Sequence, residues 1–392
     1  MLLSKFELIF KFCMKLIVDE NIAFAKEAFS SFGELKLLNG RDITNDEVKD
    51  ANVLIVRSIT QVGEKLLKNS KVKFIGTATI GTDHIDLDYL ESKKISFTDA
   101  KGCNADSVAE YVFTALLKVA IEAKLSLKGK AIGVVGIGNI GSRIVKLAEL
   151  LGLKVLKNDP PLERKGIGKN YVAFDEILEA DIITFHVPLN LDGIDKTYHI
   201  LNKERLTNIK PGAIIINTSR GPVIDNVALL KEQEKKNFNL ILDVWENEPS
   251  INTELLEKVR IGTPHIAGYS FEGKVNGTRM IYDSLCQYYK IKPAWQPELP
   301  KIERIDLKIP EGKTDEERVY KLFATIYNIQ NDNTKLREIS KYSSNDQAGY
   351  FDKLRKEYPI RREFSNYTVH LSQADSHLKQ FLECFRFKVK TD

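Results

Sequence analysis

Cysteine is scarce in this sequence, and its few cysteines are scattered. The four cysteines are far apart in the sequence, and none belongs to a Cys-x-x-Cys pair. A disulfide framework and a zinc site built on paired thiolates both need closer spacing. No grouping of histidine, cysteine and carboxylate has the spacing of metal ligands either. The sequence therefore predicts reduced thiols, no metal site and a cytoplasmic protein. The cysteines are Cys13, Cys103, Cys286 and Cys384.

The sequence also lacks long apolar runs and a strong net charge. No apolar run is long enough to span a bilayer, so we expect no association with membranes. A net charge of +4 over 392 residues is too weak to indicate nucleic acid, and a small anionic substrate fits as well. Residues 1–13 are apolar but carry Lys5, Glu7 and Lys11, unlike the core of a secretory signal. We expect these residues to be a short extension.

Short apolar runs alternate with amphipathic segments along most of the chain. A chain of 392 residues is too long for one typical core. Continuous apolar strands separated by helices are typical of parallel sheets buried on both faces. We therefore expect an α/β protein with two doubly wound, Rossmann-like domains. The predicted strands are 53–56, 72–75, 95–97, 131–135, 154–156, 182–185, 213–216, 240–244 and 259–262.

The pattern changes after about residue 291. Residues 292–300 are rich in proline and are typical of a linker. Beyond them, Thr314 can cap a helix whose apolar positions form a single stripe. Residues 367–371 and 385–389 have strand character. This segment predicts a smaller α+β domain at the C-terminus. The apolar stripe consists of Val319, Leu322, Phe323 and Ile326.

A glycine-rich motif follows the strand 131–135 and opens a helix. The first glycine makes the tight turn, the second lets backbone approach a pyrophosphate, and the third permits close packing of helix and strand. The N–H groups at the start of the helix suit phosphate. Asp159 follows at the distance expected for a carboxylate that binds ribose hydroxyls, which favours NAD over NADP. Lys157 and Arg164 lie nearby, so NADP stays open. The motif is Gly136-Ile137-Gly138-Asn139-Ile140-Gly141.

Three polar residues follow three later strands: Arg220, Glu248 and His265. Ligands of doubly wound sheets bind at the carboxyl ends of the strands. Oxidation of a 2-hydroxy acid needs a base for the hydroxyl proton, and the imidazole of His265 suits that role. Glu248 can hold the ring and stabilise its charged form. Arg220 can bind the substrate carboxylate as a fork. Taken singly, each could instead be an ordinary surface or core residue, and the other histidines are weaker candidates for the base.

These motifs resemble the D-2-hydroxyacid dehydrogenase superfamily, and the resemblance runs from Met14 to near the C-terminus. Within the superfamily, an extension at Gly268-Tyr269 and the tail resemble the branch that oxidises 4-phospho-D-erythronate. The tail segments that carry this likeness are 351–356 and 361–363. Other supporting segments are Val18-Asp19-Glu20-Asn21, Arg57-Ser58-Ile59-Thr60, Gly102-Cys103-Asn104-Ala105, Asp159-Pro160-Pro161 and Asp243-Val244-Trp245-Glu246.

The resemblance implies an NAD-dependent dehydrogenase that makes 2-oxo-3-hydroxy-4-phosphobutanoate, in pyridoxine 5′-phosphate (vitamin B6) synthesis. It implies a substrate (lid) domain of 14–108 and 268–295, an NAD-binding domain of 109–267, and a homodimer formed through 296–392. It assigns catalysis to Arg220, Glu248 and His265. It assigns substrate binding to Ser58, Thr79 and Tyr269. It assigns NAD binding, beyond the glycine motif, to Asp159, Val187, Thr218, Ser219, Asp243 and Gly268.

Some positions depart from the family pattern. Leu162 stands where relatives often carry arginine, Val187 replaces a threonine, and residues 1–13 have no counterpart. None of these departures touches the chemistry. Two alternatives stay open. One is a dehydrogenase of the same superfamily that acts on phosphoglycerate or glycerate. The other is a dinucleotide-sensing binding protein on this fold, although retention of all three catalytic residues argues against it.

The phosphate of such a substrate needs a cation or a group of N–H donors. In the first domain the candidates are Arg57, Ser58, Thr79 and Lys274. The tail adds a dense basic group, which is either a solvated face or a source of one arginine for the phosphate in a partner's cleft. The members of this group are Lys353, Arg355, Lys356, Arg361 and Arg362.

Overall fold

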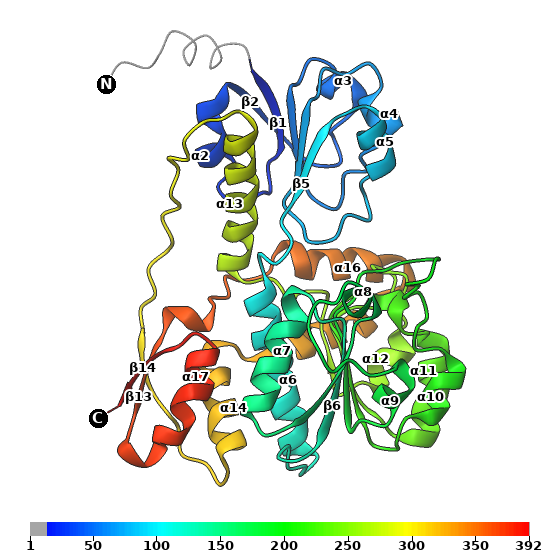
Figure 1. Ribbon diagram of the computed structural model, residues 1–392, viewed down its shortest axis with the longest axis vertical. Helices are drawn as coiled ribbons and strands as arrows, with labels where there is room; N and C mark the ends of the chain where they lie inside the picture. Colours follow the sequence, from blue (N-terminus) through cyan, green and yellow to red (C-terminus); the bar gives the residue numbers. More distant parts are fainter. Residues whose placement is uncertain (1–13, 392) are drawn as a thin grey trace. The chain divides into compact units, whose positions relative to one another are not determined.

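The computed structural model describes residues 14–391 and divides them into two compact units (Figure 1). The first unit contains residues 14–104 and 271–301, and the second contains 105–270 and 302–391. The predicted extension 1–13 lies outside the described residues. None of the helices in the described part of the chain is both long and apolar enough to cross a membrane.

The first unit is built on a five-stranded parallel sheet of order β2-β1-β3-β4-β5. All four residues of β3 are buried, as expected for a central strand covered on both faces. The predicted strand 53–56 is confirmed, whereas the strand predicted at 72–75 begins two residues later, because Phe74 pairs with Val53. The strands are β1 (Lys15–Asp19), β2 (Glu34–Leu38), β3 (Val53–Val56), β4 (Phe74–Thr77) and β5 (Ser96–Asp99). The helices are α2 (Ala25–Phe29), α3 (Asn45–Val48), α4 (Glu64–Leu67), α5 (Leu87–Ser92) and α13 (Phe271–Tyr288).

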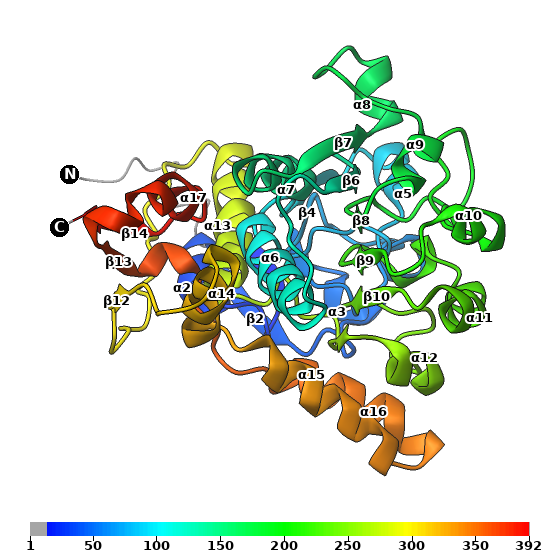
Figure 2. The same cartoon turned by 90° about the horizontal axis from the view of Figure 1, so that it is seen from below.

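The second unit contains a six-stranded parallel sheet of order β11-β10-β9-β8-β6-β7, which Figure 2 shows from β7 to β10. Alternate strand residues face opposite sides, and each side packs against its own helices. The strands are β6 (Ala131–Val135), β7 (Lys154–Asn158), β8 (Ile182–Phe185), β9 (Ile214–Asn217), β10 (Asn239–Leu242) and β11 (Ile261–Gly262). On one side lie α6 (Ala105–Glu122) and α7 (Asn139–Leu150). On the other lie α9 (Phe174–Leu178), α10 (Lys203–Asn208), α11 (Asn226–Lys236) and α12 (Thr253–Lys258).

The chain order of this sheet reverses beside β6. β6 pairs with β7 on one side and with β8 on the other, so the connections leave β6 in opposite directions. Ligands of open α/β sheets bind at such a switch point, outside the carboxyl ends of the strands. The doubly wound architecture predicted for both domains is confirmed, and it places the glycine motif at the switch point.

The C-terminal segment of the second unit forms a small parallel sheet of order β12-β13-β14. Thr314 caps the predicted helix, since its Oγ1 accepts a hydrogen bond from the Glu317 N–H at 3.2 Å. The strand predicted at 385–389 begins later, at Lys388, because Phe385 and Phe387 are buried in the core before it. The strands are β12 (Asp306–Lys308), β13 (Thr368–Leu371) and β14 (Lys388–Thr391). The helices are α14 (Asp315–Ile326), α15 (Ile329–Arg337), α16 (Ser344–Lys356) and α17 (Lys379–Cys384).

The C-terminal segment shares its apolar core with the six-stranded sheet. Phe323 of α14 and Phe113 of α6 both pack on Phe385, with ring centroids 4.8 and 5.4 Å from it. Phe364 joins the same cluster and is fully buried. The small sheet is therefore joined to the six-stranded sheet through a common core. The division into three domains stays a prediction.

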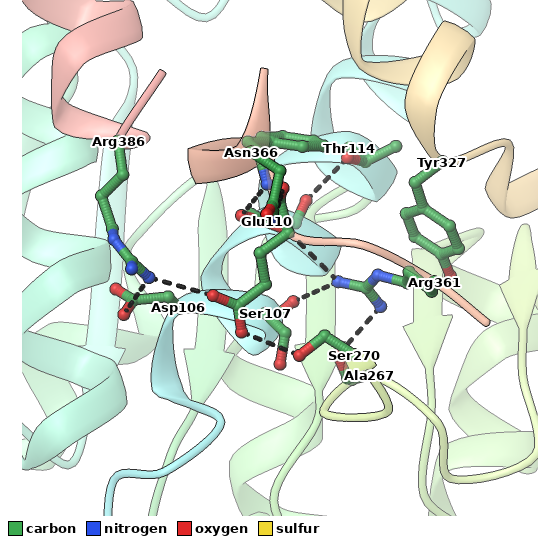
Figure 3. A network of polar contacts seen from close by, with 12 residues as sticks. Asp106, Ser107, Glu110, Thr114, Ala267, Ser270, Tyr327, Arg361, Asn366 and Arg386 are labelled. Atoms are coloured by element: carbon green, nitrogen blue, oxygen red, sulfur yellow. Dashed lines mark hydrogen bonds and ion pairs between the residues drawn. The ribbon is translucent and has the colours of Figure 1, made fainter. Parts of the chain in front are cut away.

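A buried polar network also joins the C-terminal segment to the rest of its unit (Figure 3). Arg361 is 5% exposed and donates hydrogen bonds to the carbonyls of Ser107 and Ala267, at 2.5 and 3.1 Å. Its guanidinium lies over the ring of Tyr327, 4.1 Å from the centroid. A carboxylate oxygen of Glu110 is 3.8 Å away. Arg361 therefore holds the first turn of α6 and the loop before residue 270 with one side chain.

A second set of contacts extends this network. Glu363 accepts hydrogen bonds from the Ser270 hydroxyl at 2.8 Å and from Arg386 at 3.0 Å. Arg386 also donates to Asp106 at 2.7 Å, and Arg143 donates to the same carboxylate at 2.6 Å. Asp106 and Ser270, which lie beside the two points where the chain passes between the units, are thus tied to the C-terminal segment.

We expect Arg361→Met to lower the free energy of unfolding by about 3–5 kcal/mol, because it leaves a buried carboxylate and two buried carbonyls without their cation. The exposed Lys353 supplies the matched control, and Lys353→Met should change stability by less than about 0.5 kcal/mol. Urea denaturation of both variants measures the difference. Equal stability of Arg361→Met and wild type would contradict a structural role for this network.

Candidate active site

The glycine motif adopts the geometry that a dinucleotide site needs. Gly136 has a φ of +86°, and a Cβ there would lie 2.6 Å from the carbonyl oxygen of His186. A Cβ on Gly141 would lie 1.8 Å from the carbonyl oxygen of Gly136. Neither position admits a side chain, because the turn and the contact between α7 and β6 are both too close.

Gly138 differs from the other two glycines because the space beside it is open. No atom lies within 4 Å of the position its Cβ would take, and the residue is the N-cap of the twelve-residue helix α7. A pyrophosphate can therefore approach the backbone here and meet the N–H groups of Asn139 and Ile140. This open cradle fits an NAD pyrophosphate.

Asp159 organises the edge of the same site. One carboxylate oxygen accepts a hydrogen bond from the Ile137 N–H at 2.7 Å, and the other accepts one from the Leu162 N–H at 3.0 Å. The side chain thereby ties the glycine loop to β7 and caps α8 (Pro160–Arg164). Each oxygen keeps a second lone pair, so its role in ribose binding stays a prediction.

His186 and Val187 follow β8 at the carboxyl edge of the sheet. Val187 lies against the glycine turn, with its Cγ1 2.8 Å from where a Gly136 Cβ would stand. The His186 ring makes hydrogen-bonding contacts with the hydroxyls of Thr184 at 2.9 Å and Thr218 at 3.4 Å. Burial lowers the pKa of His186 to about 3, so its ring is neutral near pH 7. A ring with so low a pKa is a weak base, which agrees with the weaker candidacy of His186 for the proton acceptor.

Asp243 lies at the end of β10 and is buried. Its carboxylate accepts hydrogen bonds from the Thr263 hydroxyl at 2.6 Å, the Ile266 N–H at 2.8 Å and the Ala267 N–H at 2.9 Å. Its backbone carbonyl accepts the N–H of His265 at 2.7 Å. Burial raises the pKa of Asp243, although the charge of His265 and these hydrogen bonds oppose that rise. Asp243 therefore fixes the loop that carries His265.

His265 and Glu248 form a directly hydrogen-bonded pair. The His265 Nδ1 lies 2.7 Å from a carboxylate oxygen of Glu248, and the other oxygen accepts the Trp245 N–H at 2.8 Å. Burial would raise the pKa of Glu248, but the charge and hydrogen bond of His265, the Trp245 N–H and the charge of Arg355 together hold it below its usual value. An ionised Glu248 leaves the Nε2 of His265 for proton transfer.

Arg220 follows β9, on the same edge of the sheet as the histidine pair. Its guanidinium donates to the Ser219 carbonyl at 2.8 Å, and its own carbonyl accepts from the Asn217 side chain at 2.9 Å. The next residue, Gly221, packs so closely on the backbone of Trp245 that a Cβ would lie 1.9 Å from it. The loop that carries Arg220 is therefore fixed against the segment that leads to Glu248.

The predicted substrate residues of the first unit lie at the carboxyl ends of its strands. The Thr79 hydroxyl contacts that of Thr77 at 2.7 Å and donates to the Gly81 carbonyl at 2.9 Å. Ser58 follows β3 and is exposed. Its neighbour Arg57 donates to the buried Asp19 at 3.1 Å. Burial and the charge of Arg57 lower the pKa of Lys274.

Tyr269 and Gly268 follow the His265 loop. The Tyr269 ring meets that of Tyr358 edge to face at 5.8 Å, and Arg355 lies 5.8 Å from its centroid. Arg355 is thus a charged residue beside Tyr269 and the catalytic loop. From the sequence it was predicted only as one member of the basic group in the tail. The sequence around Arg355 carries no signal that separates it from Lys353 or Lys356, because only the packing of α16 decides which side chain points inward.

A second histidine–carboxylate group, formed by His199, Asp225 and Glu246, was not foreseen from sequence. His199 Nε2 lies 2.6 Å from Glu246, and its Nδ1 lies 3.9 Å from Asp225. Ligand atoms of the three residues lie within 4.8 Å of one another, a spacing that suits a metal ion. Glu246 also accepts the Asn226 N–H at 2.8 Å, and the Asp225 side chain caps α11. These bonds account for the group as a brace between α11 and the loop after β10.

Comparison with known proteins decides the family. Residues 116–267 match the D-isomer specific 2-hydroxyacid dehydrogenase NAD binding domain, and residues 298–383 match a domain of unknown function (DUF3410). The erythronate-4-phosphate dehydrogenase of Cronobacter sakazakii is 42% identical over 362 residues, which are 91% of this chain and 94% of that protein. The protein of the same name from Enterobacter sp. is 43% identical, over 93% of this chain and 96% of that one.

The chain belongs to the erythronate-4-phosphate dehydrogenase family. It is accordingly an NAD-dependent dehydrogenase of the D-2-hydroxyacid type, and the predicted cofactor and enzyme class are confirmed. The predicted fold class is confirmed as well.

Solved structures of the superfamily match less of the chain than the erythronate-4-phosphate dehydrogenases do. The Aquifex aeolicus D-lactate dehydrogenase, complexed with NAD and lactic acid, has a TM-score of 0.59 and 29% identity, over 70% of this chain and 95% of its own. The NAD-bound 3-phosphoglycerate dehydrogenase of Entamoeba histolytica has a TM-score of 0.61 and 25% identity, over 71% of this chain and 95% of its own. Lower identity and coverage weigh against the phosphoglycerate alternative.

Replacement of the pair's carboxylate should move the pH dependence of oxidation. In Glu248→Gln the charged imidazole loses its stabilising partner, so the neutral base persists to lower pH. We expect a lower maximal rate and an acid limb displaced to lower pH in the pH–rate profile. The exposed Glu254→Gln is the matched control and should leave the profile unchanged.

His265→Ala gives the reference for loss of the base itself. General-base catalysis contributes about 10²–10⁴-fold, so turnover should fall by that factor while NAD still binds. An acid limb that does not move in Glu248→Gln would count against the pair.

Proposed function

We propose that the protein oxidises the C2 hydroxyl of 4-phospho-D-erythronate and yields 2-oxo-3-hydroxy-4-phosphobutanoate. The observation that carries the proposal is the 2.7 Å contact between His265 and Glu248, in a chain 42% identical to an erythronate-4-phosphate dehydrogenase along almost its whole length. NAD, when bound, accepts the hydride from C2. The dinucleotide-sensing alternative needs none of this catalytic geometry.

The base in this proposal is the Nε2 of His265. Glu248 holds Nδ1, which fixes the ring and leaves the opposite nitrogen to take the hydroxyl proton. The ionised carboxylate then stabilises the imidazolium that forms. In the reverse reaction the imidazolium returns the proton to the oxygen on C2 as the carbonyl is reduced.

Arg220 binds the substrate carboxylate in this proposal. A guanidinium fork matches the two carboxylate oxygens, and it also polarises the developing carbonyl at C2. The hydrogen bond from Arg220 to the Ser219 carbonyl supports a fixed direction for the fork. Ser58, Thr79 and Tyr269 are proposed as further substrate contacts.

The cofactor contacts proposed for this chain follow the edge of the six-stranded sheet. Gly136, Gly138 and Gly141 form the pyrophosphate turn, with Asn139 and Ile140 as N–H donors. Asp159 is proposed to bind the ribose hydroxyls. The remaining proposed contacts are Val187, Thr218, Ser219, Asp243 and Gly268.

The cellular setting is also a proposal. The family name implies a reaction that leads toward pyridoxine 5′-phosphate, and we place that reaction in the cytoplasm. We expect neither nucleic acid nor membrane as a partner, because the proposed substrate is a small molecule. The scattered cysteines, of which Cys103, Cys286 and Cys384 are free thiols, support a reducing compartment.

Turnover tests the activity most simply. Purified protein should reduce NAD with 4-phospho-D-erythronate, and should do so much more slowly with 3-phosphoglycerate or glycerate. Appearance of NADH, followed by its absorbance, measures all three rates under identical conditions. Faster oxidation of 3-phosphoglycerate or glycerate would assign the protein to the alternative activity, and no reduction with any acid would favour the binding-protein alternative.

We also propose that the protein is a homodimer formed through residues 296–392. Deletion of residues 300–392 is a poor test, because Phe323, Phe364 and Phe385 belong to the core shared with α6. Sedimentation of the full chain avoids this difficulty. A dimer should sediment with a mass about twice the 44.5 kDa of one chain. A single species at the monomer mass, at micromolar concentration, would contradict the dimer.

A further inference from the structure

The basic side chains near the end of the chain have different surroundings. Arg361 is buried and bonded to backbone carbonyls, and Arg362 donates to Asn366 at 3.1 Å. Lys353 and Lys356 are exposed on α16. The remaining member, Arg355, points from α16 toward the residues of the catalytic loop. The group is therefore neither a uniform solvated face nor a uniform anion site.

Arg355 is in contact with the catalytic loop of its own chain. Its guanidinium carbon lies 5.8 Å from the ring centroid of Tyr269, and the Tyr269 hydroxyl accepts a hydrogen bond from it. The charges of Arg355 and Glu248 act on each other, and Arg355 helps to hold the pKa of Glu248 low. Tyr269 is supported in turn by the edge of Tyr358 at 5.8 Å. Arg355 is thus a positioned cation, within electrostatic reach of the catalytic pair.

One donor of this guanidinium has no partner among the described residues. The Nε of Arg355 is shielded from solvent and makes no hydrogen bond. A buried N–H donor without a hydrogen-bond partner destabilises the fold by more free energy than a typical hydrogen bond contributes. The chain covers the Nε, so it does not itself meet a ligand; the terminal nitrogens of a guanidinium are the donors that meet phosphoryl oxygens in a fork.

The chemistry of the proposed substrate supplies such an anion. Its carboxylate is assigned to Arg220, and its phosphoryl group lies at the opposite end of a four-carbon chain. A phosphoryl group near Glu248 would be repelled by that carboxylate unless a cation offsets the repulsion. Arg355 has the charge, the donor geometry and the place to do so.

We propose that Arg355 binds the phosphoryl group of the substrate and thereby selects phosphorylated 2-hydroxy acids. The inference rests on the proposed function, because it names the residue that recognises one end of that substrate. The arginine acts in the chain that carries its own Tyr269 and Glu248. It does not need to be presented to a partner's site, which differs from the role that the sequence suggested for the tail.

The test compares 4-phospho-D-erythronate with D-erythronate in Arg355→Met, Arg355→Lys and the matched control Lys356→Met. A lost charge-assisted hydrogen bond corresponds to roughly 10–100-fold in kcat/KM. We expect the ratio of kcat/KM for the phosphorylated over the unphosphorylated acid to fall by that factor in Arg355→Met. Arg355→Lys should lose part of the ratio, because it keeps the charge but not the fork. Lys356→Met should keep the wild-type ratio.

Two kinetic outcomes would overturn the inference. An equal loss for both acids would make Arg355 a positioning residue for Tyr269 and Glu248 alone. An unchanged ratio would show that other groups hold the phosphoryl group, with Arg57 and Lys274 as the next candidates. NAD affinity, measured for each variant, confirms that the second unit is folded.

Inorganic phosphate separates this inference from the proposed function. Wild-type protein that oxidises neither 4-phospho-D-erythronate nor D-erythronate would overturn the proposed function. Binding of phosphate can be measured without turnover, so it tests Arg355 separately. At equal ionic strength, phosphate should raise the thermal midpoint of wild type and Lys356→Met above the value in chloride, and should raise that of Arg355→Met less. Equal stabilisation of all three proteins by phosphate would overturn the assignment to Arg355.

Discussion

The carboxylate of Asp243 is the interaction on which the site depends. It is buried at the end of β10 and accepts hydrogen bonds from the Thr263 hydroxyl and from the N–H groups of Ile266 and Ala267. Its backbone carbonyl binds the N–H of His265, a residue with a φ of +57°. Such a φ is rare for a side-chain-bearing residue and needs a surrounding structure that imposes it. The hydrogen bonds of Asp243 therefore hold the backbone of His265 in place, and the contact of His265 with Glu248 depends on them.

The C-terminal segment supports this loop from the other side. Arg361 donates to the carbonyl of Ala267, and the N–H of Ala267 donates to Asp243. Both backbone polar groups of Ala267 are therefore bound by buried charged side chains. Arg355 contacts Tyr269, two residues further on. A fold shared with lactate and phosphoglycerate dehydrogenases thus carries, in this chain, a C-terminal segment that reaches the catalytic loop. The proposed role of Arg355 would place a determinant of substrate choice in this tail, outside the six-stranded sheet.

The sequence predicted the sheets and the catalytic residues because both leave local signals. Apolar runs such as Val53–Val56 mark buried strands, and the polar residues that follow β9, β10 and β11 share one sheet edge by topology alone. Strand ends were less predictable, because pairing with a neighbour decides where β4 begins. The difference between Arg355 and Lys356 was not predictable at all. It depends on which face of α16 meets the catalytic loop, and that is set by packing between segments far apart in the sequence.

Transfer of a labelled hydrogen tests the central claim most directly. With 4-phospho-D-erythronate deuterated at C2, the account predicts that deuterium appears on the nicotinamide ring of the reduced cofactor, and that the rate of a single turnover falls when C2 carries deuterium. Mass spectrometry of the cofactor after one turnover measures the transfer. Reduced cofactor without deuterium, or deuterium released to water, would contradict direct hydride transfer from C2 at a site where His265 takes only the hydroxyl proton.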